Sequence, residues 1–325
     1  MSEINIVKRN GSKELLDLEK LHQVIFYACD DITGVSPSQV ELNSHISFYD
    51  GMTTTEIQET MIKAAADLIS EDTPNYQLVA GRLISYHLRK EAYGQFDVPH
   101  LYDIVKDNIA NKMYDKSLTS WYSKEEFKQM NKWIDHKRDE NYTYAAMEQF
   151  RGKYLVQDRY TGKIYETPQI ALMLIGATLF HRYPRDERLG WVKEFYDSVS
   201  RFEISLPTPV MAGVRTAIRQ FSSCVLIESG DSLDSINATA GAIVKYVSKR
   251  AGIGIGAGGI RAHGSTINGG HATHTGVIPF YKHFQSAVRS CSQGGVRGGA
   301  ATLYYPIFHL EVENLLVLKN NKGTE

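Results

Sequence analysis

Two glycine-rich segments with arginines carry the clearest chemical signal in the sequence. Residues 252–261 read GIGIGAGGIR and end at Arg261, and residues 292–299 read SQGGVRGG around Arg297. Glycines let backbone N–H groups approach phosphate oxygens, and a nearby arginine adds charge and paired hydrogen-bond donors. Glycine loops at tight bends are the structural alternative for each segment. Because both segments lie in one stretch without acidic residues, we predict two phosphate-binding loops.

The charge of the chain is distributed unevenly. The whole chain holds 36 basic and 37 acidic residues, so its net charge gives no argument for binding to nucleic acid or to a membrane. No acidic residue lies between Asp234 and Glu311, however. A concentrated positive field favours an anion site there, although a solvated basic face remains the alternative. Seven basic residues share this segment: Lys245, Lys249, Arg250, Arg261, Lys282, Arg289 and Arg297.

The glycine pattern of residues 252–259 does not indicate a dinucleotide-binding fold. The segment formally contains G-x-G-x-x-G, but such a site needs an acidic residue about 20 positions later to hold a ribose. The next acidic residue is Glu311, which is too distant. The chain also contains no G-x-x-x-x-G-K-[ST] sequence, which excludes the ordinary P-loop.

Three cysteines and two histidines are the candidates for redox or metal chemistry. Cys29, Cys224 and Cys291 lack metal-ligand spacing and cannot all pair, which fits a reducing compartment. Cys29 lies on an apolar helical face and is expected in the core. Cys224 lies in the predicted strand QFSSCVLIE, and the sequence is compatible with either an inert buried thiol or a redox thiol at this position. His271 and His274 lack further ligands nearby, so no metal site is predicted.

The elements around these residues change character along the chain. Residues 1–95 predict a hairpin turning at Asn10-Gly11, with positive φ at both residues, followed by three or four helices. Asp17 and the Thr53–Glu56 pair are predicted helix caps, and Gly94 is a predicted helix end. Residues 96–205 are mostly helical, with a predicted hairpin in KYLVQDRYTGKIYE. After residue 200, strands alternate with helices, which predicts a parallel sheet. That sheet looks unfinished at the end of the chain.

Several long strings resemble the large (α) subunit of class I ribonucleotide reductases of the Ia type. They are FSSCVLIESGDSLDSI, KRAGIGI, SCSQGGVRGGAAT and HLEVENLLVLKNN, while VKRNGSKE, YDGMTTTEI, IKAAADLI and HLRKEAYGQF resemble that family's ATP-cone. The resemblance implies a mixed α and α/β fold. It implies an ATP-cone over residues 1–95, with a β-hairpin and a four-helix bundle, and a helical domain over 96–205. Residues 206–325 are then the first part of a ten-stranded α/β barrel with its specificity-site loops.

The resemblance also implies the chemistry. The family reduces ribonucleoside diphosphates to deoxyribonucleoside diphosphates with a protein thiyl radical, and two further cysteines become a disulfide. Cys224 matches one of these reducing cysteines. Thr208, Ser223 and the loop at Gly252 match positions that cradle the substrate diphosphate. The radical cysteine, the partner of Cys224 and the tyrosine relay have no match in this chain, so it is expected to be inactive alone.

Two allosteric nucleotide sites follow from the same resemblance. The specificity site, which selects the substrate base, departs from some relatives at Asn268, where they have arginine. The activity site binds ATP or dATP, with magnesium, and departs at Gln58, where some relatives have histidine. The specificity site matches Asp231, Ser232, Leu233, Arg261, Asn268, Gln293 and Arg297. The activity site matches Lys8, Glu14, Leu15, Leu16, Asp17, Leu18, Glu19, Lys20, Thr54, His87 and Lys90.

The expected partners are the carboxy-terminal part of the large subunit, a radical-generating small (β) subunit, a second large subunit, and thioredoxin or glutaredoxin as reductant. No catalytic metal, nucleic acid or membrane is expected, and the expected location is the cytoplasm because no signal or spanning segment is recognisable. Either the chain is part of a longer subunit, or the subunit is encoded in two pieces, which Met1 favours. The alternatives are a stand-alone ATP/dATP-sensing regulatory module and a cobalamin-dependent reductase.

Overall fold

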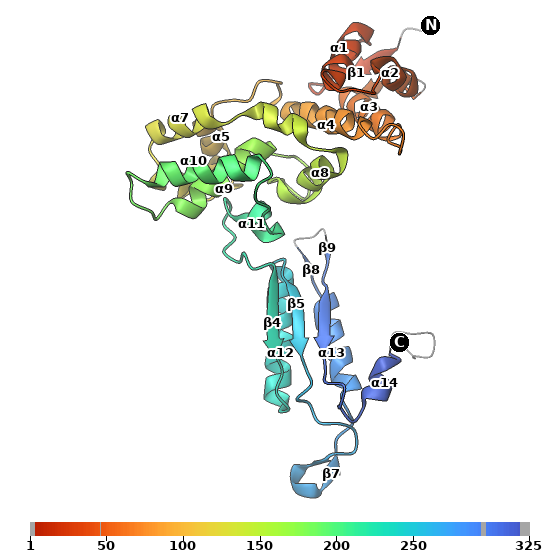
Figure 1. Ribbon diagram of the computed structural model, residues 1–325, viewed down its shortest axis with the longest axis vertical. Helices are drawn as coiled ribbons and strands as arrows, with labels where there is room; N and C mark the ends of the chain where they lie inside the picture. Colours follow the sequence, from red (N-terminus) through yellow and green to blue (C-terminus); the bar gives the residue numbers. More distant parts are fainter. Residues whose placement is uncertain (1–3, 46, 294–296, 319–325) are drawn as a thin grey trace. The chain divides into compact units, whose positions relative to one another are not determined.

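The computed structural model describes residues 4–45, 47–293 and 297–318, with the backbone alone for His45, Ser292, Gln293 and Arg297. The chain divides into two compact units (Figure 1). The first unit comprises Met1–Leu206 with Val210–Arg219, and the second comprises Pro207–Pro209 with Gln220–Glu325. The first unit is mainly helical, while the second is built around a parallel sheet.

The first unit begins with a small three-stranded sheet of order β2-β1-β3. β1 (Asn5–Val7) pairs antiparallel with β2 (Lys13–Leu15) and parallel with β3 (Met52–Thr53). The prediction of positive φ at both turn residues was wrong, because Gly11 alone of the pair has positive φ, at 83°. The amide of Gly11 donates to Lys8 O and the amide of Lys8 donates to Ser12 O. The connection is therefore a longer loop whose single left-handed residue is the glycine.

Four helices follow this sheet: α1 (Leu18–Cys29), α2 (Pro37–His45), α3 (Thr54–Ala66) and α4 (Tyr76–Tyr93). The predicted caps are confirmed. The Asp17 side chain accepts from the amides of Glu19 and Lys20, and Thr53 and Glu56 form a reciprocal capping box. α4 ends at Gly94, which has a left-handed φ of 71°. Cys29 is buried on α1, as predicted.

The rest of the first unit is a helical assembly around the buried helix α9. Ile170, Leu172 and Leu174 on α9 are all fully buried, which matches its continuous apolar sequence. The predicted hairpin after residue 153 is reduced to a single bridge between Gln157 and Ile164. The elements are α5 (Leu101–Ala110), α6 (Leu118–Trp121), α7 (Lys124–Trp133), η1 (His136–Asn141), α8 (Tyr144–Gln149), the π-helix η2 (Phe150–Tyr154), α9 (Pro168–Phe180), α10 (Arg188–Ser200) and α11 (Thr208–Gly213), whose first two residues belong to the second unit.

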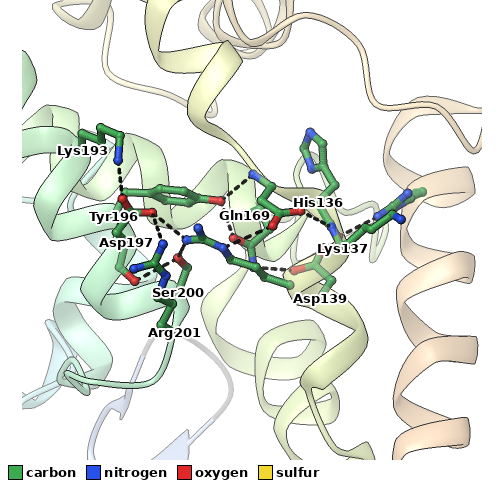
Figure 2. Close-up of polar contacts among 12 residues, drawn as sticks. His136, Lys137, Asp139, Gln169, Lys193, Tyr196, Asp197, Ser200 and Arg201 are labelled. Carbon is green, nitrogen blue, oxygen red and sulfur yellow. Dashed lines mark hydrogen bonds and ion pairs between the residues drawn. The ribbon is translucent and has the colours of Figure 1, made fainter. Parts of the chain in front are cut away.

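A chain of hydrogen bonds joins η1 to α9 and α10 (Figure 2). The Asp135 amide donates to the Tyr196 hydroxyl at 2.9 Å, and that hydroxyl donates to Gln169 Oε1 at 2.7 Å. Gln169 Nε2 then donates to Asp139 Oδ1 at 2.9 Å. Asp139 is fully buried, and its second oxygen has no partner among the described residues. Burial raises the pKa of Asp139 to about 7, against weaker opposing effects of Gln169 and Arg89.

The second unit contains three parallel strands in the order β10-β5-β4. β4 (Cys224–Glu228) and β10 (Ala301–Tyr304) flank the central β5 (Gly252–Gly256). The long helices α12 (Leu233–Ser248) and α13 (Ile278–Arg289) pack together and share a core with the sheet. The remaining elements are β6 (Thr266–Ile267), η3 (Asn268–Gly270), β7 (Ala272–Thr273), β8 (Ser292–Gln293), β9 (Arg297–Gly298) and α14 (Val312–Leu316).

The structure corrects the prediction of a glycine loop at residues 252–256. GIGIG is the central strand β5, with Ile253 and Ile255 buried in the core and the glycines on the opposite face. Side chains alternate between the two faces of a strand, so the alternation of glycine and isoleucine was itself a strand signal. A Cβ at Gly254 would lie 2.4 Å from Leu226 Cδ2, which shows how closely the neighbouring strand approaches.

Candidate functional site

One face of the sheet in the second unit is left open. We call it the open face and define it by the residues that share the register of the β5 glycines. Cys224 pairs with Gly252, Leu226 with Gly254 and Glu228 with Gly256. On the other side, Thr302 pairs with Gly254 and Tyr304 with Gly256. Leu226 is 81% exposed, so the described residues leave this face uncovered.

Cys224 lies at the first position of β4 and is the exposed one of the three cysteines, whereas Cys29 is buried and Cys291 is intermediate. A thiol must reach its reaction partner, so accessibility on a sheet face fits redox chemistry better than a core role. Two of the predicted substrate residues adjoin it, since the Gly252 amide donates to Ser223 O at 2.8 Å. The third, Thr208, lies at the start of α11.

The carboxyl end of β4 leads to a second cluster. The Arg261 amide donates to Asp231 Oδ1 at 2.8 Å, and its Nε donates to Asp231 Oδ2 at 2.5 Å. Burial alone would raise the pKa of Asp231, but the hydrogen bonds from Arg261 outweigh it and the pKa falls below its usual value. Arg261 Nη1 also donates to Thr266 O at 3.1 Å. The pair therefore fixes the start of the β5–α13 connection against the loop after β4.

The N-terminus of α12 lies directly beside this pair. The side chain of Ser232 caps α12 by accepting from the amide of Ser235, and Leu233, the first helical residue, is 67% exposed. A helix N-terminus offers free N–H groups and a partial positive charge to an anion. Asn268 opens η3 in a left-handed conformation with a φ of 52° and is exposed. The structure thus joins Asp231, Ser232 and Arg261 in one cluster.

Gln293 and Arg297 face each other in the short antiparallel ladder of β8 and β9. This pairing concerns the backbone, and both side chains lie outside the described residues. Residues 294–296, which connect the two strands, also lie outside them. The prediction that Gln293 and Arg297 contact a nucleotide therefore stays a prediction.

A cleft of about 690 Å³ lies in the first unit between the small sheet, α1, α3 and α4. Lys8 Nζ and Glu14 Oε2 form an ion pair across its hairpin wall at 2.8 Å, and Lys90 Nζ lies 4.6 Å from the centre of the Tyr86 ring. The volume and the basic groups suit a nucleotide with its phosphates. Seven of the predicted activity-site residues line this cleft: Lys8, Glu14, Leu16, Asp17, Lys20, Thr54 and Lys90.

Four predicted activity-site residues do not line the cleft. Leu15 and Leu18 are exposed at 52% and 45%, and Glu19 is exposed on the first turn of α1. His87 is buried within α4, where burial lowers its pKa to about 4 although Glu59 opposes the shift. Helical spacing explains the division on α1, because residues three or four apart share one face. The same spacing places Gln23, Val24 and Tyr27 on the cleft, and Arg9, Tyr86 and Phe96 line it from other elements, although none of these six was predicted as a site residue. Gln58, the position at which the activity site departs from some relatives, also lines the cleft.

Among the described ranges, no three His, Cys, Asp or Glu side chains gather where they could hold a metal ion. Within the same part of the chain, no helix has the length and apolarity needed to span a membrane.

Three family models match this chain and together define its class. The family model for the ATP cone domain matches residues 4–91, the model for the all-alpha domain of ribonucleotide reductase matches residues 140–219, and the model for its barrel domain matches residues 222–325. The two reductase models together span more than half of the chain.

Individual relatives are consistent with this class. The chain is 64% identical over 320 residues to ribonucleoside-diphosphate reductase 1 subunit alpha of Escherichia coli, covering 98% of this chain and 42% of that protein. It is 63% identical to the alpha subunit of Haemophilus influenzae with the same coverage, and 54% identical to that of phage T4, covering 100% of this chain and 43% of the relative. The chain belongs to the ribonucleotide reductase large-subunit family, and it spans less than half the length of these relatives.

Proposed function

We propose that this chain supplies the amino-terminal portion of a ribonucleoside-diphosphate reductase large subunit. The observation that carries the proposal is the exposed Cys224 on the open face, one strand length from the Asp231–Arg261 cluster. A thiol for chemistry and a cluster for nucleotide recognition at opposite ends of β4 fit an enzyme under nucleotide control. The strong sequence identity to reductase alpha subunits supports the same reading.

In the proposed reaction Cys224 is one of two reducing thiols. The 2′-hydroxyl leaves the ribose as water after taking one proton, and the 2′ carbon gains the second proton and two electrons as a new C–H bond. The two thiols supply both protons and both electrons, and a disulfide forms between them. Ser223, Gly252 and Thr208 would hold the substrate diphosphate. The second thiol, the radical cysteine and the re-reducing cysteines belong to the remainder of the large subunit, and a small (β) subunit supplies the radical. We expect this chain alone to have no reductase activity.

Two nucleotide sites would regulate that reaction. The cleft of the first unit would bind ATP or dATP with magnesium, using Lys8, Lys20 and Lys90 for the phosphates. The cluster around Asp231 and Arg261 would bind a deoxynucleoside triphosphate that selects the substrate, together with Gln293 and Arg297 from the following loop. In this proposal residues 1–95 form the ATP-cone with its hairpin and helix bundle, and 96–205 form the helical domain.

The remainder of the large subunit would complete a ten-stranded barrel of which residues 206–325 form the first part. A groove of about 660 Å³ beside β10, α13 and α14 supports this, since its walls include Phe284, Leu303 and Leu315. An uncovered edge strand and an apolar groove are costly to leave open to water. Further partners in this proposal are a second large subunit and thioredoxin or glutaredoxin, in the reducing cytoplasm that the free thiols suit.

The direct test mixes this chain with a polypeptide carrying the remainder of the large subunit and with a small subunit, and measures reduction of a ribonucleoside diphosphate. We expect turnover in the complete mixture. We also expect that Cys224→Ser abolishes turnover without changing ATP binding, while the matched control Cys291→Ser retains both. Absence of turnover with the wild-type chain, or full turnover with Cys224→Ser, would contradict the proposal.

A second candidate function is a regulatory module that senses ATP or dATP without taking part in catalysis. The observation in its favour is that the cone cleft is lined entirely by residues of the first unit. Such a module has no use for an exposed thiol on the open face. The Cys224→Ser variant separates the two functions. If the chain is only a sensor, the variant would still regulate the assembled enzyme, and the turnover of that enzyme would not change.

A further inference from the structure

The connection between β5 and α13 is held at both ends by one buried carboxylate. We call residues 260–277 the effector loop, because they carry Arg261 and Asn268 of the proposed specificity site. Glu311 Oε2 accepts a hydrogen bond from the His263 amide at 2.9 Å and another from the Val277 amide at 2.9 Å. The two amides lie at the beginning and at the end of the loop, so a single oxygen ties its ends together.

The residues around Glu311 are arranged to keep the carboxylate in place. Glu311 is 8% exposed, and its own amide donates to His309 Nδ1 at 3.1 Å. The proton of His309 is then on Nε2, which donates to Ile260 O at 3.0 Å. Gly276 has a positive φ of 94°, and a Cβ there would lie 2.6 Å from Glu311 Oε1. A glycine is therefore needed at this position for both conformation and space.

The charge pattern makes this carboxylate unusual. Glu311 is the first acidic residue after the acid-free segment that follows Asp234, and it is buried instead of lying on the surface. Asp231 holds the Arg261 amide from the end of β4, and Glu311 holds the His263 amide from the segment after β10. Two carboxylates that follow different strands in the sequence thus fix the start of the effector loop. Hydrogen bonds from amides to a carboxylate are stronger than those to a neutral acceptor.

We infer that Glu311 is a positioning residue for effector binding: it pre-forms the effector loop so that Arg261 is held ready for the triphosphate of a deoxynucleotide. The inference rests on the proposed function of the Asp231–Arg261 cluster. Without the carboxylate the two loop ends would lose their common anchor, and the loop would occupy its binding conformation for a smaller fraction of the time. The apparent affinity for the nucleotide falls in proportion to the fraction of chains whose loop is in the binding conformation.

The test uses the full chain with dTTP as the probe in calorimetric titrations. Binding that Arg261→Ala removes is assigned to the specificity cluster, and ATP binding that Lys90→Ala removes is assigned to the cone cleft. We expect Glu311→Ala to weaken dTTP binding by about tenfold, because the free loop must be ordered on binding. ATP binding in the cone cleft should not change. In hydrogen exchange, the amides of His263 and Val277 should exchange faster.

Two further variants separate positioning from general stability. Glu311→Gln keeps one oxygen that can accept both amides, so we expect dTTP affinity within about threefold of the wild type. Glu313→Gln makes the same change at an exposed position two residues away and should have no effect. The inference is overturned if Glu311→Ala binds dTTP as the wild type does, if Glu311→Gln loses as much as Glu311→Ala, or if ATP binding is lost in parallel.

A failure of the proposed function would look different. If the wild-type chain binds no dTTP, the specificity site is not where we propose it. Hydrogen exchange of the effector loop without nucleotide still decides the role of Glu311. Unchanged exchange in Glu311→Ala would by itself overturn the inference that Glu311 positions the loop, while faster exchange at His263 and Val277 would support it.

Discussion

Three of the buried carboxylates in the described part of the chain have different surroundings. Glu166 is fully buried against the equally buried Arg215, which donates to both of its oxygens. Glu311 accepts two backbone amides, and Asp139 has a single neutral donor in Gln169. A buried charge is tolerated when it is paired or hydrogen-bonded, and Asp139 has the fewest such partners of the three.

Asp139 should make the stability of the first unit depend on pH. Its pKa is about 7 in the folded chain against 3.8 for an ordinary aspartate, so the folded state holds a proton that the unfolded state releases between these values. The stabilising contribution is complete below about pH 4 and is lost as the pH rises through 7. In denaturant titrations, we expect Asp139→Asn to remove this decline and to be at least as stable as the wild type at pH 8.

Asp197, which is drawn in the same cluster, provides the matched control (Figure 2). Its hydrogen bonds from Lys193 and Arg138 outweigh burial and lower its pKa, so its contribution is present at neutral pH and is lost in acid. Asp197→Asn should therefore destabilise the chain at pH 8. If the two variants changed stability in the same direction at pH 8, the assignment to Asp139 would be wrong.

At the scale of elements, the features fixed by short-range chemistry could be predicted from the sequence. Asp17 and the Thr53–Glu56 box cap their helices because a side-chain oxygen two or three residues away satisfies a free amide. β5 was missed as a strand because its glycines were interpreted only as loop residues. The cleft residues Tyr86 and Phe96 were missed because they come from different elements, and tertiary packing brings them together.

Close packing of elements gives a prediction at Gly81 on α4. Helix propensity alone favours Gly→Ala by up to about 1 kcal/mol. A Cβ at Gly81 would, however, lie 2.1 Å from Tyr142 O, a backbone atom that cannot move aside easily. We expect Gly81→Ala to lower the thermal midpoint of the first unit clearly, since overpacking typically costs about 1–3 kcal/mol.

The control is Gly190→Ala on α10, where nothing lies within 4 Å of the added Cβ. The same substitution should leave the midpoint unchanged or raise it slightly, because only the propensity remains. A midpoint for Gly81→Ala equal to or above that of Gly190→Ala would show that α4 and the Tyr142 carbonyl are not in close contact.

At the scale of the whole molecule, the division into two units predicts two unfolding transitions in scanning calorimetry. A ligand stabilises the part that it binds, by an amount set by its concentration relative to its dissociation constant. If the proposed sites are right, ATP should raise the transition of the first unit through the cone cleft, and dTTP should raise the transition of the second. Lys90→Ala should remove the first shift alone. A single transition that both nucleotides raise equally would contradict this assignment.

The glycine side of β5 has a consequence for what can lie against the sheet. Leu226 Cδ2 and Glu228 Oε2 cover Gly254 and Gly256, since they lie 2.4 Å and 2.3 Å from where a Cβ would be, whereas no described side chain lies within 4 Å of a Cβ at Gly252. In the proposed reaction, the ribose would therefore lie against the peptide group of Gly252, beside Cys224. Gly252→Ala would place a methyl group there and hold the ribose farther from the sulfur.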